Sequence, residues 1–181
     1  SNTQLTSIFG RDDYKFGNKI SDLKSTSADT TFKAYGSVNK WITKGSISKG
    51  TAVRIVMQTV NSIDYLNIET YSVSDSSVLE QAESAAILGI ALNDASDGGE
   101  CYVCTKGITT VIVGNIFLPN TGAYGILSNI GSATGKIVGL GANTGILGNT
   151  PVVGYFLETK STNTSVGDYL LFKVTTNFEF N

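Results

Sequence analysis

The 181-residue chain contains no histidine. Histidine is the usual general base near neutral pH, the partner of nucleophilic serine and cysteine, and the commonest metal ligand. Its absence excludes the Ser–His and Cys–His nucleophile systems and removes the most frequent ligand from any metal site. We therefore expect a protein that is not an enzyme and that has no cofactor and no metal centre.

Charge is also scarce. The chain has 13 Lys and Arg and 15 Asp and Glu residues, which make up 15% of it and give a net charge of −2, against an average of about 25% charged residues in soluble domains. The basic residues are scattered, so nucleic acid is not expected as the main partner. A sparsely charged surface fits an ordinary all-β domain covered by hydroxyl and amide groups. It equally fits a protein covered by neighbouring subunits.

Long hydrophobic runs are missing as well. No stretch reaches the roughly 20 apolar residues of a transmembrane helix, so no membrane partner is expected. The opening SNTQLTSIFG has no charged leader followed by an apolar segment, so no secretion signal is expected. These features predict a protein made in the cytoplasm.

The two cysteines form a C-x-x-C motif at Cys101 and Cys104. A zinc site would need a second pair of ligands. On a strand, side chains three positions apart point to opposite faces, so the two sulfurs are not placed to bond. We predict two buried or half-buried thiols with no redox or metal role.

The clearest pattern in the chain is that of successive β-strands between Ala85 and Val113. Ile87–Leu92 is an apolar run, Asn93–Gly99 consists of turn formers, and Glu100–Thr105 is a second extended run. Ile108–Val113 follows and is rich in β-branched residues. This pattern predicts an all-β scaffold with no catalytic motif.

Other segments agree with that fold class. Thr51–Val56, Ile63–Val73, Val152–Leu157 and Asp168–Phe180 have the composition of strands, and the alternation of apolar and polar residues is clear in the first two. Ser77–Glu80 matches a helix capping box, so we expect at most one short helix, of one to three turns, at this place.

Residues 1–36 differ from the rest, because single aromatic residues are spaced among polar ones without a clear period. We predict an extended N-terminal arm anchored by Phe9, Tyr14, Phe16, Phe32 and Tyr35. The aromatic side chains would pack either on the body of the same chain or on a neighbouring subunit. A partly ordered terminus is the other interpretation.

Two segments of the remaining chain are similar to one another, and we call this similarity the internal echo. Ile87–Leu92 and Val152–Leu157 both consist of two aliphatic residues, a glycine and an apolar triplet, and each is followed by a polar turn and another strand. The echo is either a chance similarity of two hairpins or the sign of two β-modules in tandem. We place module 1 at 37–115, and glycine-rich loops with module 2 at 116–181. The two modules could share one core.

At these residues the sequence resembles the small β-barrel modules of tailed-phage and other viral structural proteins, namely head-decoration (cement) proteins and the head or attachment domains of fibres. The resemblance covers Trp41–Val113 and, more loosely, Gly125–Val174. It is carried by the turn and strand Gly45–Val53, by Gly89–Leu92 with the acidic turn after it, and by Lys106-Gly107. The sequence departs from the pattern at the two cysteines and in its glycine-dense middle.

The resemblance implies a virion protein on the outside of the capsid, without enzymatic activity and often trimeric. The expected partners are a major capsid protein or other virion subunits, together with further copies of the chain. The alternative is a fibre or tail tip that binds host glycans through glycine-rich loops between residues 122 and 148. In addition to the five aromatic residues of the arm, we expect Trp41 and Tyr124 to make interactions.

Overall fold

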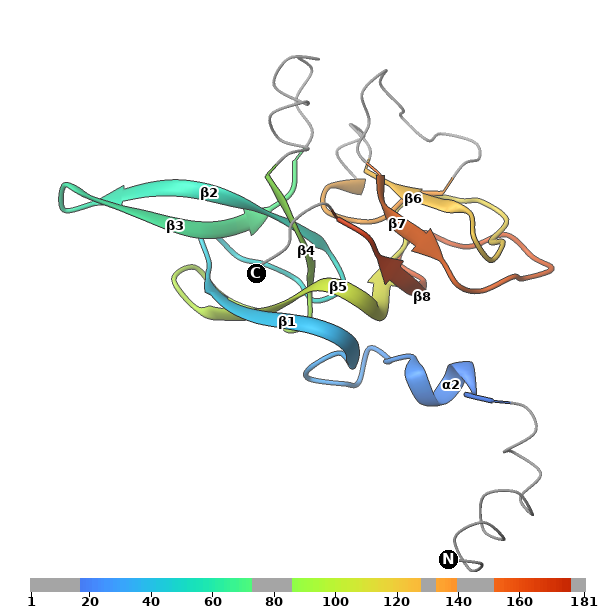
Figure 1. Cartoon of the computed structure of the whole chain (residues 1–181). Helices are drawn as coiled ribbons and strands as arrows, with labels where there is room; N and C mark the ends of the chain where they lie inside the picture. The colour runs from blue at the N-terminus through green and yellow to red at the C-terminus, as the bar shows by residue number, and fades with distance from the viewer. Residues whose placement is uncertain (1–16, 73–85, 128–132, 140–151, 177–181) are drawn as a thin grey trace, which may run out of the picture.

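The computed structural model describes residues 17–72, 86–127, 133–139 and 152–176 (Figure 1). This part of the chain is almost entirely β-structure, which confirms the predicted fold class. The capping box at Ser77–Glu80 lies outside the described residues. The strands are β1 (Ala34–Ile42), β2 (Ala52–Val60), β3 (Ile63–Thr70), β4 (Ile87–Ala91), β5 (Glu100–Ile112), β6 (Tyr124–Ile126), β7 (Val152–Phe156) and β8 (Tyr169–Val174).

The sequence predicts an extended arm before β1, but the described part of it, residues 17–33, is not extended throughout. It contains one four-residue helical turn, α2 (Ile20–Leu23), which buries none of its side chains. The turn closes locally, because the N–H of Lys24 donates to the carbonyl of Ile20 at 2.8 Å. An isolated turn of this length has little stability of its own, so the contacts that follow it in the chain fix its position.

The strands form one antiparallel sheet in the order β3-β2-β4-β5-β8-β7-β6, and β1 pairs with β5. The 13-residue β5 is the long strand of this sheet. Its first half pairs with β4 and its second half with β8, so the sheet is continuous from one predicted module into the other (Figure 1). β5 changes partners at Gly107, which faces Gly36 of β1. A Cβ atom on either glycine would collide with the opposite main chain.

The first half of the sheet curls into a small barrel made of β1, β5, β4, β2 and β3. A bridge between Thr43 and Ile68 joins its two ends, where the N–H of Lys44 donates to the carbonyl of Ile68 at 2.7 Å. One apolar cluster fills the barrel: Ile47, Val53, Ile68, Leu88, Ala91, Cys101 and Val103. At the start of β5 the buried Cys101 and Val103 alternate with the exposed Glu100 and Tyr102, as expected for a strand with one face toward a core.

A larger apolar cluster joins the two halves of the molecule. It includes Ile90 and Cys104 from the range of module 1, and Phe156 and Phe172 from the range of module 2. Phe32, which precedes β1, is buried in the same cluster. Residues from across the sequence therefore contribute to one continuous apolar interior.

The two echoed segments occupy matching positions in the sheet. Gly89 is on β4, which lies between β2 and β5. Gly154 is on β7, which lies between β6 and β8. A Cβ atom at Gly89 would collide with the carbonyl of Cys104, and one at Gly154 with the carbonyl of Lys173. In both copies a glycine is required because the neighbouring strand leaves no room for a side chain. This shared requirement favours the interpretation of the echo as a structural repeat.

Replacing Gly89 or Gly154 by alanine is expected to lower the free energy of unfolding by about 3 kcal/mol, because the new methyl group forces two strands apart. Gly98→Ala is the matched control. Its Cβ meets nothing within 4 Å, and only its positive φ of 76° makes alanine unfavourable, at about 1 kcal/mol. Urea denaturation measures all three variants, and equal losses would contradict the steric explanation.

Candidate interaction surfaces

The two thiols are buried and free, as the sequence predicts. Cys104 lies in the cluster that joins the two halves, and Cys101 lies inside the barrel. Burial raises the pKa of each thiol from 9.0 to about 11. A protonated, enclosed thiol is a poor nucleophile. The described residues also contain no group of three or more Cys, Asp or Glu side chains that could hold a metal ion.

In the described residues, no helix is long and apolar enough to cross a bilayer.

The predicted aromatic anchors have different environments. Phe9, Tyr14 and Phe16 lie outside the described residues. Phe32 packs on the body of its own chain, where its ring meets Tyr169 edge-on at a centroid distance of 5.7 Å. This contact holds the end of the N-terminal segment against the core.

The other predicted residues do not gather into one surface. Tyr35 is exposed on β1, whereas Trp41, also on β1, is half-buried against the cluster inside the barrel. Tyr124 is exposed on β6, at the other end of the sheet path, and its ring lies 5.2 Å from that of Tyr155. The loops proposed for glycan binding include residues 128–132 and 140–148, which lie outside the described residues.

A polar contact attaches the N-terminal segment to the second half of the molecule. The carboxylate of Glu158 is almost fully buried and accepts a hydrogen bond from the N–H of Leu171 at 2.7 Å. The amino group of Lys24 reaches the two carboxylate oxygens at 3.2 and 3.1 Å, and that of Lys160 lies 3.6 Å away. The N–H of Ser25 donates to the hydroxyl of Thr110 at 2.8 Å and extends the attachment.

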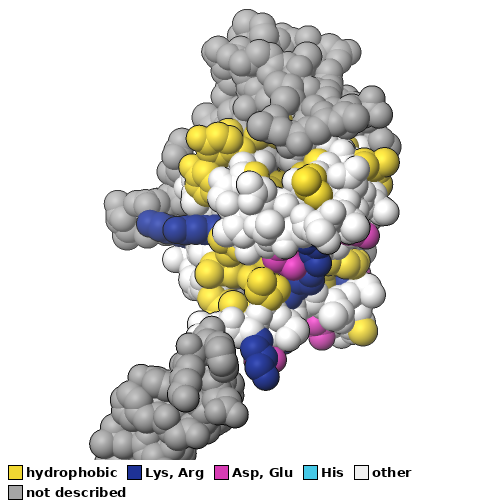
Figure 2. Space-filling view, turned by 90° about the vertical axis from the view of Figure 1, so that its right-hand side faces the viewer, with side chains coloured by type: hydrophobic (Ala, Val, Ile, Leu, Met, Phe, Trp, Pro, Cys, Tyr) yellow, Lys and Arg dark blue, Asp and Glu magenta, His cyan; other side chains and the backbone are white. Residues whose placement is uncertain are grey.

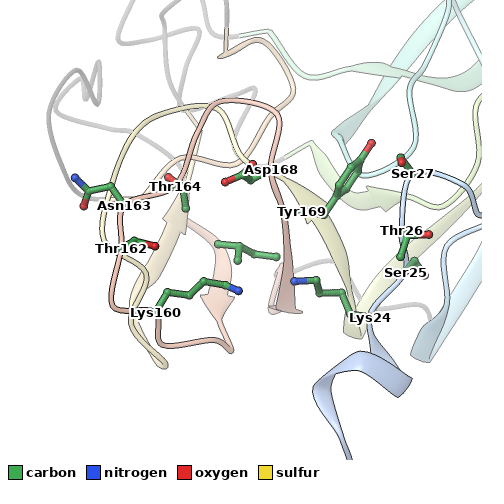
Figure 3. Close-up of a pocket in the computed structure, with 11 residues that line it drawn as sticks. Lys24, Ser25, Thr26, Ser27, Lys160, Thr162, Asn163, Thr164, Asp168 and Tyr169 are labelled. Atoms are coloured by element: carbon green, nitrogen blue, oxygen red, sulfur yellow. The ribbon is translucent and has the colours of Figure 1, made fainter.

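A depression with a volume of about 460 Å³ lies beside this contact (Figure 3). Lys24 and Lys160 approach from opposite sides with their amino groups turned toward one another. Hydroxyl and amide side chains such as Thr26, Thr162 and Asn163 line the rest. The carboxylate of Glu158, which contacts both lysines, offsets part of their charge. Figure 2 shows basic and acidic side chains side by side near the middle of the face that it draws. The depression therefore has no strong charge of one sign.

The most apolar exposed element is the hairpin formed by β2 and β3, which extends beyond the rest of the sheet (Figure 1). Asn61 and Ser62 connect the strands with φ angles of 51° and 63°, the left-handed pair of a tight type I′ turn. Met57 and Leu66 face one another across the strands and are 62% and 65% exposed. We call the residues from Met57 to Leu66 the hairpin tip.

The hairpin tip has apolar side chains on both faces. Met57 and Leu66 continue the face whose buried members, Val53 and Ile68, lie inside the barrel. The opposite face bears three exposed apolar side chains: Val60, Ile63 and Tyr65. Nearer the body, that same face is polar and includes the ion pair of Arg54 with Glu69. Exposed apolar side chains thus lie on both faces of the hairpin tip, beside polar pairs such as Thr59 with Asp64.

Sequence reasoning missed the hairpin tip as an interaction surface, although it predicted strands on either side of the turn. The available signal was that apolar residues occur at both odd and even positions of each strand, and therefore on both of its faces. They are Met57 and Val60 on one strand, and Ile63 and Leu66 on the other. A strand with one solvated face has apolar residues at one parity only.

No protein-family model matches the chain, and no curated protein matches its sequence. Among solved structures, the chain is similar to the N base of the head fiber protein gp8.5 of bacteriophage phi29. The TM-score is 0.41 and the identity 12%, over 80% of this chain and all of that one. A similarity this low assigns neither a fold nor a function to this chain.

The buried thiols predict a dependence of stability on pH. Between pH 9 and about 11 the unfolded chain releases its thiol protons while the folded chain retains them. The stabilisation from the thiols is therefore complete below pH 9 and is lost as the pH rises. We expect the stability difference between the natural protein and a Cys101→Ala, Cys104→Ala variant to shrink over this interval in denaturant titrations. A constant difference would contradict the burial of the thiols.

The attachment of the N-terminal segment gives a second prediction. Glu158→Ala leaves Lys24 and the Leu171 N–H without their acceptor in a buried setting, and we expect a loss of about 2 kcal/mol in the free energy of unfolding. Lys160→Ala removes the partner that is exposed to solvent and should cost less than about 0.5 kcal/mol. Thermal and urea denaturation compare the two. The attachment would be refuted if the lysine variant lost as much stability as the glutamate variant.

Proposed function

We propose that this protein is a non-enzymatic structural subunit of a virus particle, on the capsid exterior, which stabilises the shell through contacts with neighbouring subunits. The observation that carries the proposal is the hairpin tip, with exposed apolar side chains on both faces. Such a ribbon is suited to insertion against other proteins.

The size of the apolar surface supports a binding role. Full burial of a side chain such as Leu or Met contributes about 1.5–3 kcal/mol, and Met57 and Leu66 are the two most exposed apolar side chains in the described part of the chain. Burying them against a partner would stabilise both the hairpin and the assembly. Monomeric proteins seldom expose apolar groups on an isolated projecting element.

The virion setting is supported by the sequence resemblance. The segments that carry it, Gly45–Val53 and Gly89–Leu92, form the turn before β2, the start of β2 and most of β4 of the barrel. The two thiols pack inside the apolar clusters, which fits a role that depends on contacts.

The test is binding of the purified protein to capsids assembled without it from the genome that encodes it. The double variant Met57→Glu, Leu66→Glu is expected to bind at least about tenfold more weakly, since burying two unpaired carboxylates opposes association. The matched control is Ile116→Glu, Leu118→Glu, which changes two side chains of similar exposure in the other half of the molecule. The control should bind normally.

Co-sedimentation with capsids gives the affinities, and far-UV circular dichroism checks the fold of each variant. Failure of the natural protein to bind any capsid would overturn the proposal. If the protein then gave a signal on a glycan array that Tyr124→Ala abolished, the alternative of a receptor-binding fibre or tail tip would replace it.

A further inference from the structure

The outer edge of β3 is only partly covered. β3 ends the path of the sheet, and the chain just after β1 meets its outer side at Ile68, whose carbonyl accepts the N–H of Lys44. Main-chain groups alternate in direction along a strand. Because those of Ile68 point outward, those of Leu66 and Asp64 point outward too. In the described part of the chain, no strand pairs with Ile63–Asn67 on this side.

Within the described residues, this edge has little of the usual protection. Natural proteins guard exposed edges with lysine, proline, bulges or covering loops. The section Ile63–Asn67 has no lysine or proline, and its pairing with β2 continues without a register shift. Its one charge is Asp64, whose carboxylate accepts the hydroxyl of Thr59 at 2.7 Å. The edge is therefore open to pairing with another strand.

We propose that the open edge of β3 pairs antiparallel with β3 of a second copy of this chain, about a two-fold axis at Tyr65. In this register Asp64 of each copy lies opposite Leu66 of the other, and both pairs exchange main-chain hydrogen bonds. Tyr65 faces Tyr65 of the second copy in the closer, non-hydrogen-bonded pair. Cross-strand aromatic pairs in this position stabilise a sheet.

The second copy fits because the edge is self-complementary. The open section runs from Ile63 to Asn67, with Tyr65 at its centre, so an antiparallel copy uses all of it. Pairing ends where Ile63 of the second copy meets Asn67, next to Ile68, which is already bonded to Lys44. A partner strand that continued past Asn67 toward Ile68 would collide with the chain at Thr43 and Lys44.

A depression of about 370 Å³ lies beside the same edge, lined by Ile42, Tyr65, Asn67 and Asp97, among others. In the proposed register Ile63 of the second copy lies next to Asn67 and on its face of the sheet, because directly opposite residues share a face. The exposed Ile63 side chain thus reaches this depression, and the same contact forms twice. The expected assembly is a two-fold dimer, which differs from the trimer that the resemblance implies.

Cross-linking tests the register. Directly opposite residues in a non-hydrogen-bonded pair have Cα atoms about 4.5 Å apart, within the range that a disulfide spans. Tyr65→Cys is therefore expected to give a covalent dimer on mild oxidation. Tyr102→Cys, at a position of nearly equal exposure on β5, is the matched control and should remain a monomer on denaturing gels. Equal cross-linking of the two variants would overturn the register.

A proline substitution tests the edge itself. Asp64→Pro removes an N–H that points away from β2, so the hairpin can keep its own ladder. The dimer loses a hydrogen bond in each copy, and dimerisation should weaken by about thirtyfold. Asp64→Ala loses the same carboxylate but keeps the N–H, and should dimerise normally. Analytical ultracentrifugation measures both, with circular dichroism as the check on folding.

The inference does not require the proposed virion role, and the two can fail separately. Self-association is measured without capsids, and Asp64→Pro leaves Met57 and Leu66 in place. A natural protein that sediments as a monomer at all concentrations, or as a trimer, would overturn the dimer. So would an Asp64→Pro variant that dimerises as well as Asp64→Ala. Neither result bears on whether the chain binds capsids.

Discussion

The main-chain ladder of β5 is the interaction on which the rest of the structure depends. This one strand gives hydrogen-bond partners to β1 along one edge and to β4 and then β8 along the other. Buried main-chain groups must be paired, so the halves of the sheet are held together by the strand that they share. The change of partners occurs at Gly107, where the absence of a side chain lets β1 approach closely.

Apolar packing follows from this arrangement. One cluster fills the barrel and another fills the space between the halves, and Cys101 and Cys104 of β5 contribute to one each. The C-x-x-C spacing thus distributes two small apolar side chains to two cores. Three positions along a strand separate its faces, which is why this motif has a packing role here.

The same sheet that forms the cores also extends beyond them. β2 and β3 are longer than β4, which pairs with β2. The far ends of β2 and β3 therefore project beyond the body and still carry apolar residues on the face that lines the barrel. Met57 and Leu66 continue an interior face into solvent. The chain has few charged residues that could keep such a surface in water, and the proposed contacts with other subunits would bury it. The proposed function and the proposed dimer both use this hairpin, one through its faces and the other through its edge.

The hairpin tip and the attachment of the N-terminal segment could not be predicted from the sequence, because both depend on how distant parts of the chain are arranged. The strands around Asn61 and Ser62 are visible in the alternation of the sequence, but alternation does not state how far a strand extends beyond its neighbours. The attachment of Lys24 to Glu158 joins residues far apart in the sequence that share no local signal. Phe32 was recognised as an anchor, and the structure places it on its own body.

The sequence by itself determined the fold class, the glycines of the two echoed strands and the burial of the thiols. These depend on local periodicity, on the steric needs of closely paired strands and on residue type. All three can be recognised in short stretches of the sequence. Only the tertiary structure decided the order of the strands, the sharing of β5 and the exposure of the hairpin tip. Those properties depend on which distant strands pair, and the free energy of such pairing belongs to the folded chain as a whole.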